Sequence, residues 1–488
     1  MVMQQMIDSQ ALHTDFYQLN MMKTYWELGR ADKKAVFECY FRKMPFKSGY
    51  AIFAGLERLV NYLDQLKFSE DDIDYLREVT DYPEEFLDYL KDFKFECTVR
   101  SAVEGEMVFN DEPLVQVEGP LAQCQLIETA LLNIINYQTL IATKAARIKS
   151  VVEDDVVMEF GTRRAQEMDA AIWGTRAAFI GGFDATSNVK AGKLFGIPIA
   201  GTHAHSLIQS YLDDYEGFKA YAMTHKDCVF LVDTYDTLLS GVPNAIRVAR
   251  EMGDKINFQG VRIDSGDMAY ISKKVRKQLD EAGFPDAKIY ASNDLDESTI
   301  LNLKMQRAKI DVWGVGTKLI TAYDQPALGA VYKLVSIEND QGQMVDSIKL
   351  SSNAEKVSTP GKKQVWRITA EDGKSEGDYI TLWHEDPRKQ NELFMFHPVH
   401  TFINKTVENF DARPILVDIY HKGKRVYDLP ELFEIKQTAQ QSLDSLWEEY
   451  KRNLNPQKYP VDLSKECWNH KMRTIEKVRK GVQKNRNK

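Results

Sequence analysis

The segment His203-Ala204-His205 places two imidazole rings two residues apart. On a β-strand, residues i and i+2 share a face, so both rings would point the same way. Such a pair suits a metal site, or one catalytic imidazole whose proton is held by a carboxylate such as Asp233. A metal site needs more ligands, and His225 is the only other histidine between residues 206 and 383. The sequence therefore disfavours the metal pair and leaves open whether the rings are catalytic or structural.

Arginines beside Gly and Thr predict a site for an anion. Arg163 and Arg262 lie at the ends of short apolar runs, and a guanidinium fork suits carboxylate or phosphate. The segment Gly314-Val315-Gly316-Thr317 can present backbone N–H groups to a phosphate, as can many turns. Further polar residues suit ribose hydroxyls or a phosphate-bound Mg²⁺, although they also suit turns: Asp264, Asp267, Asn293 and Asp294.

The elements that must position these residues form a repeating pattern after about residue 151. Short apolar runs alternate with stretches long enough for a helix, which is typical of a parallel sheet covered on both faces. The runs are residues 156–160, 197–200, 228–232, 260–263, 287–291 and 311–315. Each leads into polar or Gly residues, and a (β/α) barrel collects its chemistry at those strand ends. An open Rossmann-type sheet would concentrate it at one switch point, so the pattern favours a barrel.

The segments before and after this repeating pattern are typical of antiparallel strands. Antiparallel strands are expected at 36–42, 96–118, 328–337, 346–351, 364–369 and 378–385, and an amphipathic helix at 430–454. We therefore predict an α/β protein with an irregular TIM-like (β/α) barrel over residues 126–330. Residues 1–125 and 331–430 should form a second β-rich α/β sandwich domain, because neither set completes a sheet alone. Residues 431–488 should be a C-terminal helical extension with a basic tail.

Composition excludes several classes of protein. The 488 residues carry a net charge of −9, which disfavours general nucleic-acid binding. The first ten residues lack signal-peptide character, and no apolar run has the length of about 18 residues that a membrane span needs. The five cysteines are scattered without a CxxC motif, as in a cytoplasmic protein with reduced thiols. P-loop, HExxH and GxSxG motifs are missing from the sequence.

Taken together, these motifs resemble the nicotinate phosphoribosyltransferase family, type II phosphoribosyltransferases of NAD salvage. The matching blocks are residues 14–18, 37–46, 159–166, 181–188, 201–206, 232–237, 261–267, 292–297 and 313–319. The resemblance implies that nicotinate and phosphoribosyl pyrophosphate give nicotinate mononucleotide and pyrophosphate, with ATP and Mg²⁺ as cofactors. It implies that ATP phosphorylates His205 and that Asp233 is the partner of this histidine. No role carries over onto His203.

The resemblance also implies the binding residues and a homodimer with shared sites. Tyr17 of a partner subunit and Phe160 would sandwich the pyridine ring, and Arg163, Thr202 and Arg262 would surround the nicotinate. The phosphoribosyl pyrophosphate contacts would be Arg262, Asp264, Asn293, Asp294, Gly316 and Thr317. Ser187 stands where the nicotinamide-using enzyme has a carboxylate, so a hydroxyl here favours nicotinate.

Four alternatives stay open at this point. They are the nicotinamide-using enzyme, a quinolinate-using decarboxylating enzyme, a non-catalytic nucleotide-binding sensor, and a metal-dependent barrel hydrolase that uses the histidine pair. The sensor would have no use for His205 and Asp233, and the hydrolase would need bound zinc.

Overall fold

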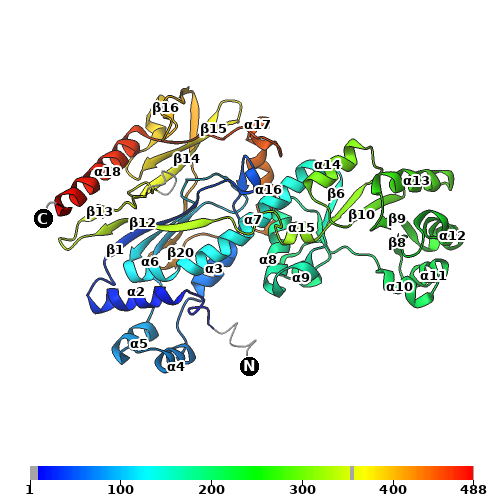
Figure 1. Ribbon diagram of the computed structural model, residues 1–488, viewed down its shortest axis with the longest axis horizontal. Helices are drawn as coiled ribbons and strands as arrows, with labels where there is room; N and C mark the ends of the chain where they lie inside the picture. Colours follow the sequence, from blue (N-terminus) through cyan, green and yellow to red (C-terminus); the bar gives the residue numbers. More distant parts are fainter. Residues whose placement is uncertain (1–8, 352–356, 487–488) are drawn as a thin grey trace. The chain divides into compact units, whose positions relative to one another are not determined.

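The computed structural model describes residues 9–351 and 357–486, which form two compact units (Figure 1). One unit is Ile141–Pro326, and the other combines the chain up to Leu140 with the chain from Ala327 onward. The division falls within the long helix α7 (Glu128–Val152). No helix among the described residues is long and apolar enough to cross a membrane.

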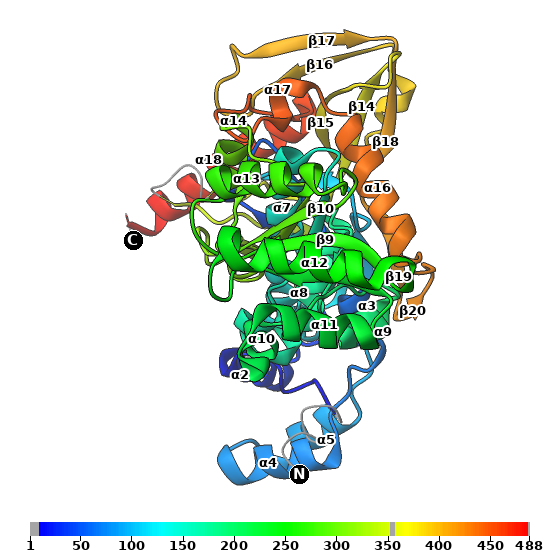
Figure 2. The same cartoon turned by 90° about the vertical axis from the view of Figure 1, so that its right-hand side faces the viewer.

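The unit 141–326 is built on a six-stranded parallel sheet in the order β7-β6-β11-β10-β9-β8. Its strands are β6 (Val156–Glu159), β7 (Ala185–Thr186), β8 (Asp227–Leu231), β9 (Asn257–Ile263), β10 (Lys288–Ser292) and β11 (Val312–Val315). Its helices are α8 (Glu167–Ile180), α9 (Val189–Phe195), α10 (His205–Tyr211), α11 (Asp214–Thr224), α12 (Val242–Met252), α13 (Met268–Glu281), α14 (Glu297–Met305) and α15 (Thr317–Ile320). Figure 2 shows α11, α12 and α13 on one face of the sheet at β9 and β10, and α11 also contacts β8. Buried Phe218, Phe230, Val248 and Ile289 belong to the core between these layers.

This sheet is a curled half-barrel, and the closed barrel predicted from the sequence is not confirmed. Within residues 141–326 its edge strands are β7 and β8, which do not pair with each other. The apolar run 197–200, expected to be a strand, forms only a single bridge between Ile199 and Thr186. Pro198 lacks the N–H that a strand ladder needs, and Gly196 before it has a left-handed φ of 70° that ends α9.

The other unit contains a seven-stranded sheet in the order β13-β12-β1-β5-β3-β19-β20. The strands are β1 (Lys34–Phe41), β3 (Thr98–Ser101), β5 (Val115–Pro120), β12 (Ala330–Glu338), β13 (Met344–Asp346), β19 (Val417–His421) and β20 (Lys424–Arg425). β1 pairs antiparallel with β12, with Cys39 opposite Tyr332. This pairing brings segments from before and after the parallel sheet into one sheet. Its N-terminal helices are α2 (Phe16–Glu27), α3 (Leu56–Asp64), α4 (Glu70–Val79), α5 (Glu84–Lys91) and α6 (Leu121–Leu126).

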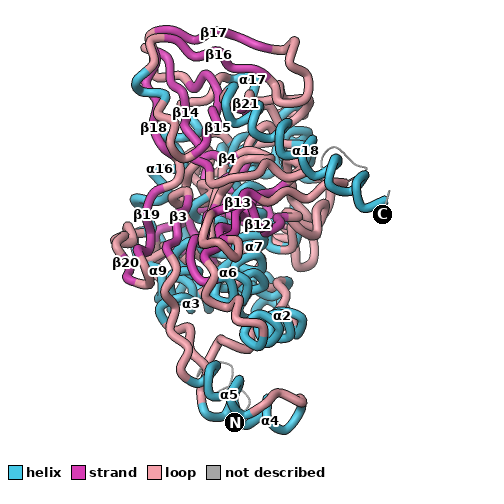
Figure 3. Tube along the Cα trace, turned by 90° about the vertical axis from the view of Figure 1, so that its left-hand side faces the viewer, coloured by secondary structure: helices cyan, strands magenta, loops and turns pink. Residues whose placement is uncertain are grey.

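A second sheet of this unit has the order β18-β14-β15-β21. It consists of β14 (Lys363–Ala370), β15 (Ser375–Leu382), β18 (Phe410–Pro414) and β21 (Val461–Leu463). The ribbon of β16 (Glu392–Phe396) and β17 (Asn404–Glu408) packs on it through Leu393, Met395 and Val407 (Figure 3). β2 (Ala51–Ile52) pairs with β4 (Met107–Val108). The C-terminal segment is α16 (Leu432–Asp444), α17 (Glu448–Lys451), β21 and α18 (Lys465–Arg486), so it also contributes a strand to this sheet.

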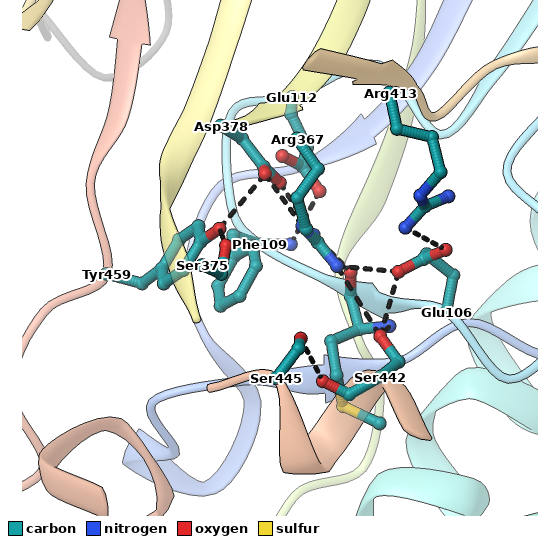
Figure 4. A network of polar contacts seen from close by, with 11 residues as sticks. Glu106, Phe109, Glu112, Arg367, Ser375, Asp378, Arg413, Ser442, Ser445 and Tyr459 are labelled. Carbon is teal, nitrogen blue, oxygen red and sulfur yellow. Dashed lines mark hydrogen bonds and ion pairs between the residues drawn. The ribbon is translucent and has the colours of Figure 1, made fainter. Parts of the chain in front are cut away.

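One buried guanidinium joins distant segments of this unit (Figure 4). The Arg367 side chain, 2% exposed, donates from Nε and Nη2 to the two oxygens of Asp378 at 2.9 and 2.8 Å. Its Nη1 donates to Glu106 at 2.6 Å, and Glu106 also accepts from Ser442 of α16 at 2.8 Å. Tyr459 donates to Asp378 at 3.0 Å. Arg367 therefore links carboxylates that lie far apart in the sequence, and Arg413 also pairs with Glu106, at 2.9 Å.

We expect Arg367→Met to destabilise the protein severely, because it removes the cation that pairs with buried Asp378 and leaves Glu106 with Arg413 alone. Removing one partner of a buried ion pair costs about 3–5 kcal/mol in the free energy of unfolding. Urea denaturation followed by circular dichroism measures this loss. Arg388→Met is the matched control, since Arg388 is exposed and forms its ion pair with Asp386 in the same turn. Equal losses in the two variants would contradict a structural role for the network.

Candidate active site

The candidate site lies at the carboxyl ends of the parallel strands. β8 leads into Asp233 and Thr234, β9 leads into Asp264, and His205 begins α10. The Nε2 atom of His205 lies 3.9 Å from Asp233 Oδ1 and 3.9 Å from Asp264 Oδ2. Its Nδ1 atom lies 3.1 Å from the hydroxyl of Thr234. The structure thus brings together the histidine and the carboxylate that the sequence paired.

Asp233 is a buried carboxylate, and only one of its two oxygens accepts hydrogen bonds from the described residues. The side chain is 2% exposed. Its Oδ2 accepts hydrogen bonds from the backbone N–H of Asp264 at 2.9 Å and from the hydroxyl of Ser265 at 2.6 Å. Its Oδ1 has no hydrogen-bond partner among the described residues. Because buried polar atoms are nearly always paired, this oxygen points to a role with the neighbouring imidazole of His205.

His203 has a different environment from His205. It is buried, its Nε2 accepts from the backbone N–H of Leu231 at 3.1 Å, and its Nδ1 donates to the carbonyl of Ala204 at 3.3 Å. Burial lowers the pKa of His203 to about 4. The ring is therefore neutral, with both nitrogens used by the backbone.

The expectation that both rings project from one strand is wrong. His205 is the first residue of α10, and residues 201–204 are not in a strand. His203 therefore turns into the protein, whereas the His205 side chain is 39% exposed. Within the chain that the structure describes, no three His, Cys, Asp or Glu side chains are grouped to hold a metal ion. The geometry gives the metal-pair interpretation no support.

The guanidinium of Arg262 on β9 is oriented by hydrogen bonds to residues 202 and 203. Its Nη1 donates to the hydroxyl of Thr202 at 2.7 Å and its Nη2 to the carbonyl of His203 at 3.3 Å. Its Nε is buried and has no hydrogen-bond partner among the described residues. Burial lowers the pKa of Arg262, while the nearby carboxylates of Asp264 and Asp233 oppose that shift. The guanidinium is thus oriented by the loop before α10, and its Nε donor stays unused among the described residues.

Phe160 follows β6 and is fixed against β11. Its backbone N–H donates to the carbonyl of Val315 at 2.8 Å. A Cβ atom on Gly314 would lie 2.7 Å from the Phe160 ring, so glycine is what lets the ring occupy this place. Arg163 and Ser187 are exposed in the loops after β6 and β7. An open pocket of about 480 Å³ adjoins these two loops. Its lining includes Thr162, Met168, Ile172, Asn188 and Lys190.

The loops after β10 and β11 hold the remaining predicted residues of this unit. Asn293 and Asp294 are exposed and have φ angles of 101° and 42°. Two consecutive non-glycine residues with positive φ are unusual, and such strain clusters at functional sites. Gly316 and Thr317 follow β11, which pairs with β10 so that Ser292 lies opposite Gly314. The two loops therefore emerge from adjacent strands at the same edge of the sheet.

Tyr17 belongs to the other unit of the chain. It lies on α2, and its side chain projects into solvent with 49% of its surface exposed. Its expected place in the site of a partner subunit stays a prediction.

Three hydroxyl side chains complete the site and were not assigned from the sequence. Thr234 contacts His205, Ser265 donates to Asp233, and Ser292 donates to Asp264 at 2.6 Å. Thr234 and Ser265 each directly follow an aspartate of the site, and Ser292 ends β10. Their position at strand ends was a usable signal, but a hydroxyl alone does not reveal which carboxylate it serves.

Comparison with known proteins gives a consistent result over nearly the whole chain. Models of nicotinate phosphoribosyltransferase match in three parts: the N-terminal domain at residues 12–136, the family at 156–364 and the C-terminal domain at 362–471. The nicotinate phosphoribosyltransferase of Bacillus subtilis (strain 168) is 62% identical over 477 residues, covering 98% of this chain and 97% of the relative. That of Caenorhabditis elegans is 37% identical, covering 94% and 92%. The crystal structure of human nicotinic acid phosphoribosyltransferase is similar with a TM-score of 0.83 at 30% identity, covering 94% of this chain and 99% of that chain.

We expect His203 to make the free energy of unfolding decrease as the pH is lowered. Its pKa falls from about 6.5 in the unfolded chain to about 4 in the fold, so the unfolded state binds the proton more tightly. Its contribution is therefore fully present above pH 6.5 and is lost, by up to about 3 kcal/mol, as the pH falls to 4. The free energy of unfolding of His203→Gln should lose this slope, whereas that of the exposed His225→Gln should keep it. A wild-type slope retained in His203→Gln would show that His203 is not the buried neutral ring described above.

Proposed function

This chain belongs to the nicotinate phosphoribosyltransferase family, and we propose that His205 and Asp233 couple its reaction to ATP. The chain converts nicotinate and phosphoribosyl pyrophosphate to nicotinate mononucleotide and pyrophosphate. The single observation that carries the proposal is the unpartnered, buried Oδ1 of Asp233, which lies 3.9 Å from the Nε2 of the half-exposed His205. A carboxylate beside one ring nitrogen fixes which nitrogen holds the proton.

The proposed coupling step uses the other ring nitrogen. Asp233 keeps the proton on Nε2 of His205, so that the lone pair of Nδ1 attacks the γ-phosphorus of ATP. The bond from that phosphorus to the oxygen of the departing ADP breaks, and a phosphohistidine forms. Nδ1 lies 3.1 Å from the hydroxyl of Thr234, and this hydroxyl can rotate away. The phosphate on His205 then adds negative charge beside Asp264 and favours Mg²⁺ there.

Nicotinate would bind on the β6, β7 and β9 side of the sheet edge. Arg163 and Arg262 would supply positive charge for its carboxylate, and the unused Nε of Arg262 is a donor already oriented by Thr202. Phe160 would stack on one face of the pyridine ring and Tyr17 of a second subunit on the other. Ser187 would donate its hydroxyl to the carboxylate, where an acidic residue would repel it.

Phosphoribosyl pyrophosphate would bind across the loops after β9, β10 and β11. Asp264, Asn293 and Asp294 would face the ribose, while the backbone of Gly316 and Thr317 would bind the 5′-phosphate. Mg²⁺ would suit this site because it prefers one or two carboxylates plus phosphate oxygens, and when bound it would supply positive charge for the pyrophosphate. The transition state resembles an oxocarbenium ion, so the residues mainly hold the ring nitrogen of nicotinate in line with the anomeric carbon.

The assembly is part of the same proposal. The enzyme would be a homodimer, because a ring sandwich completed by Tyr17 needs a second copy of the chain. We place this homodimer in the cytoplasm. The exposure of Tyr17 on α2 supports its availability to such a copy.

We expect Ser187→Asp to weaken the use of nicotinate by about a hundredfold, since juxtaposed like charges cost several kcal/mol. Steady-state kcat/KM for nicotinate measures this, and the use of nicotinamide should fall less or rise. Ser298→Asp is a matched control, because Ser298 is also exposed but lies on α14. Unchanged turnover of nicotinate in Ser187→Asp would place Ser187 outside the pocket.

We expect radiolabel from γ-phosphate-labelled ATP to appear on His205 as an acid-labile, base-stable phosphate. His205→Ala should lose both the label and the stimulation by ATP, while keeping slow phosphoribosyl transfer. Asp233→Asn should lower the labelling, because an amide does not favour the required tautomer. His203→Ala should remain labelled, because the backbone occupies both nitrogens of that ring.

The exposed His225→Ala serves as a further control and should label like the wild type. Label that survives in His205→Ala but vanishes in His203→Ala would show that His203, and not His205, carries the phosphate. Label unchanged in all the variants would overturn the coupling mechanism.

A further inference from the structure

A second buried carboxylate, Asp296, lies next to the loops after β10 and β11. It follows Asn293 and Asp294 by two residues and is the N-cap of α14, where its Oδ1 accepts from the backbone N–H of Thr299 at 2.7 Å. The side chain is only 6% exposed. Its Oδ2 is not needed for the cap, and it accepts from Lys318 Nζ at 2.8 Å and from the Tyr323 hydroxyl at 2.9 Å.

The two donors come from the neighbouring loop. Lys318 directly follows Thr317, and Tyr323 lies just beyond α15. The acceptor Asp296 lies after β10 and both donors lie after β11. Since β10 and β11 are paired neighbours, the carboxylate bridges the two connections that leave them.

The electrostatics keep Asp296 ionised. Burial raises the pKa of its carboxyl, but the hydrogen bonds from Lys318, Thr299 and Tyr323 outweigh burial and hold this pKa well below its ordinary value. The bond to Asp296 in turn raises the pKa of Tyr323 to about 12. The link is therefore a charge-assisted one over the whole neutral range.

The residue next to Asp296 anchors it to the rest of this unit. Glu297 accepts from Lys144 Nζ at 2.7 Å and from Arg147 Nε at 2.9 Å, both on α7. Asp324, which follows Tyr323, also accepts from Lys144, at 3.0 Å. The first turn of α14 and the end of the connection after β11 are thus held to the same helix.

We propose that Asp296 is a positioning residue that locks the loop Gly316–Thr317 to the loop Asn293–Asp294, and so sets the spacing of the site for phosphoribosyl pyrophosphate. The inference rests on the proposed binding of this substrate by those loops. The positive φ angles of Asn293 and Asp294 strengthen it, because strained backbone persists only where its surroundings hold it in place. Asp296 touches neither substrate and acts through Lys318.

Asp296→Asn separates the two uses of this side chain. Asn is as good an N-cap as Asp, so α14 keeps its cap, but Lys318 loses its counter-charge. Hydrogen bonds to charged groups are strong enough that we expect the KM for phosphoribosyl pyrophosphate to rise about tenfold. The KM for nicotinate should stay within about twofold, because the loops after β6 and β7 are untouched by Asp296.

Asp155→Asn is the matched control. Asp155 likewise accepts from a lysine and one neutral donor, Lys304 at 3.2 Å and the indole N–H of Trp313 at 3.0 Å. It precedes β6, at the amino ends of the strands, so its loss should leave the KM for phosphoribosyl pyrophosphate unchanged. Lys318→Met should reproduce the effect of Asp296→Asn. The double variant should be no worse than either single one, because both changes remove the same link.

The outcomes distinguish this inference from the proposed function. Wild-type formation of nicotinate mononucleotide tests the function itself and does not depend on Asp296. With the wild type active, an unchanged KM for phosphoribosyl pyrophosphate in Asp296→Asn would overturn the positioning role. Equal rises in both KM values, or an equal effect of Asp155→Asn, would show a general structural defect and would overturn it as well. Additive effects of Asp296→Asn and Lys318→Met would show that the two residues do not act as one link.

Discussion

The placement of Asp233 depends on the register between β8 and β9. Leu231 pairs with Arg262, and two residues further on the carboxylate of Asp233 accepts from the backbone N–H of Asp264. That register is reached only because the pairing shifts between Cys228 and Val229, which places one extra residue in β9. A shift of one residue would turn every later side chain to the opposite face of the sheet.

Gly260 makes this shift possible. Its φ is 149°, and a Cβ atom there would lie 1.9 Å from the carbonyl oxygen of Lys288 on β10. Only glycine allows the strands to approach so closely at that point. In this register, Arg262 donates a hydrogen bond to Thr202, and the backbone N–H of Leu231 donates to His203. These two contacts hold the loop before α10, which places His205 near Asp233. The position of the proposed pair of His205 and Asp233 thus follows from the backbone of two central strands.

The sequence predicted the parts of this arrangement that depend on local patterns. The apolar runs 156–160, 228–232 and 287–291 are strands as expected, because each is bounded by turn residues and buried on both faces. The sequence also led us to expect that the segments before and after the parallel sheet join, since neither set completes a sheet alone, and β1 pairs with β12. The strand expected at 197–200 failed because Pro198 interrupts the ladder. β7 has only two residues, which gives no periodic signal.

The roles within the histidine pair could not be derived from spacing. Whether His203 faces the core or the site depends on where α10 begins, and that boundary lies at His205. The network around Arg367 could not be predicted from the sequence either, because its members come from four segments that meet only in the fold. By contrast, the strand-end positions of the residues in the family motifs could be expected from the sequence, because parallel strands carry their carboxyl ends to one edge of a sheet.

The central claim is that Asp233 fixes the proton of His205 on Nε2. Nitrogen-15 NMR of the histidine-labelled enzyme, recorded where the ring of His205 is neutral, tests this directly, with His205→Ala used to assign the signal. The account predicts a protonated Nε2 and an unprotonated Nδ1 in the wild type, and a mixture of tautomers in Asp233→Asn. A wild-type ring protonated on Nδ1, unchanged by Asp233→Asn, would contradict the account.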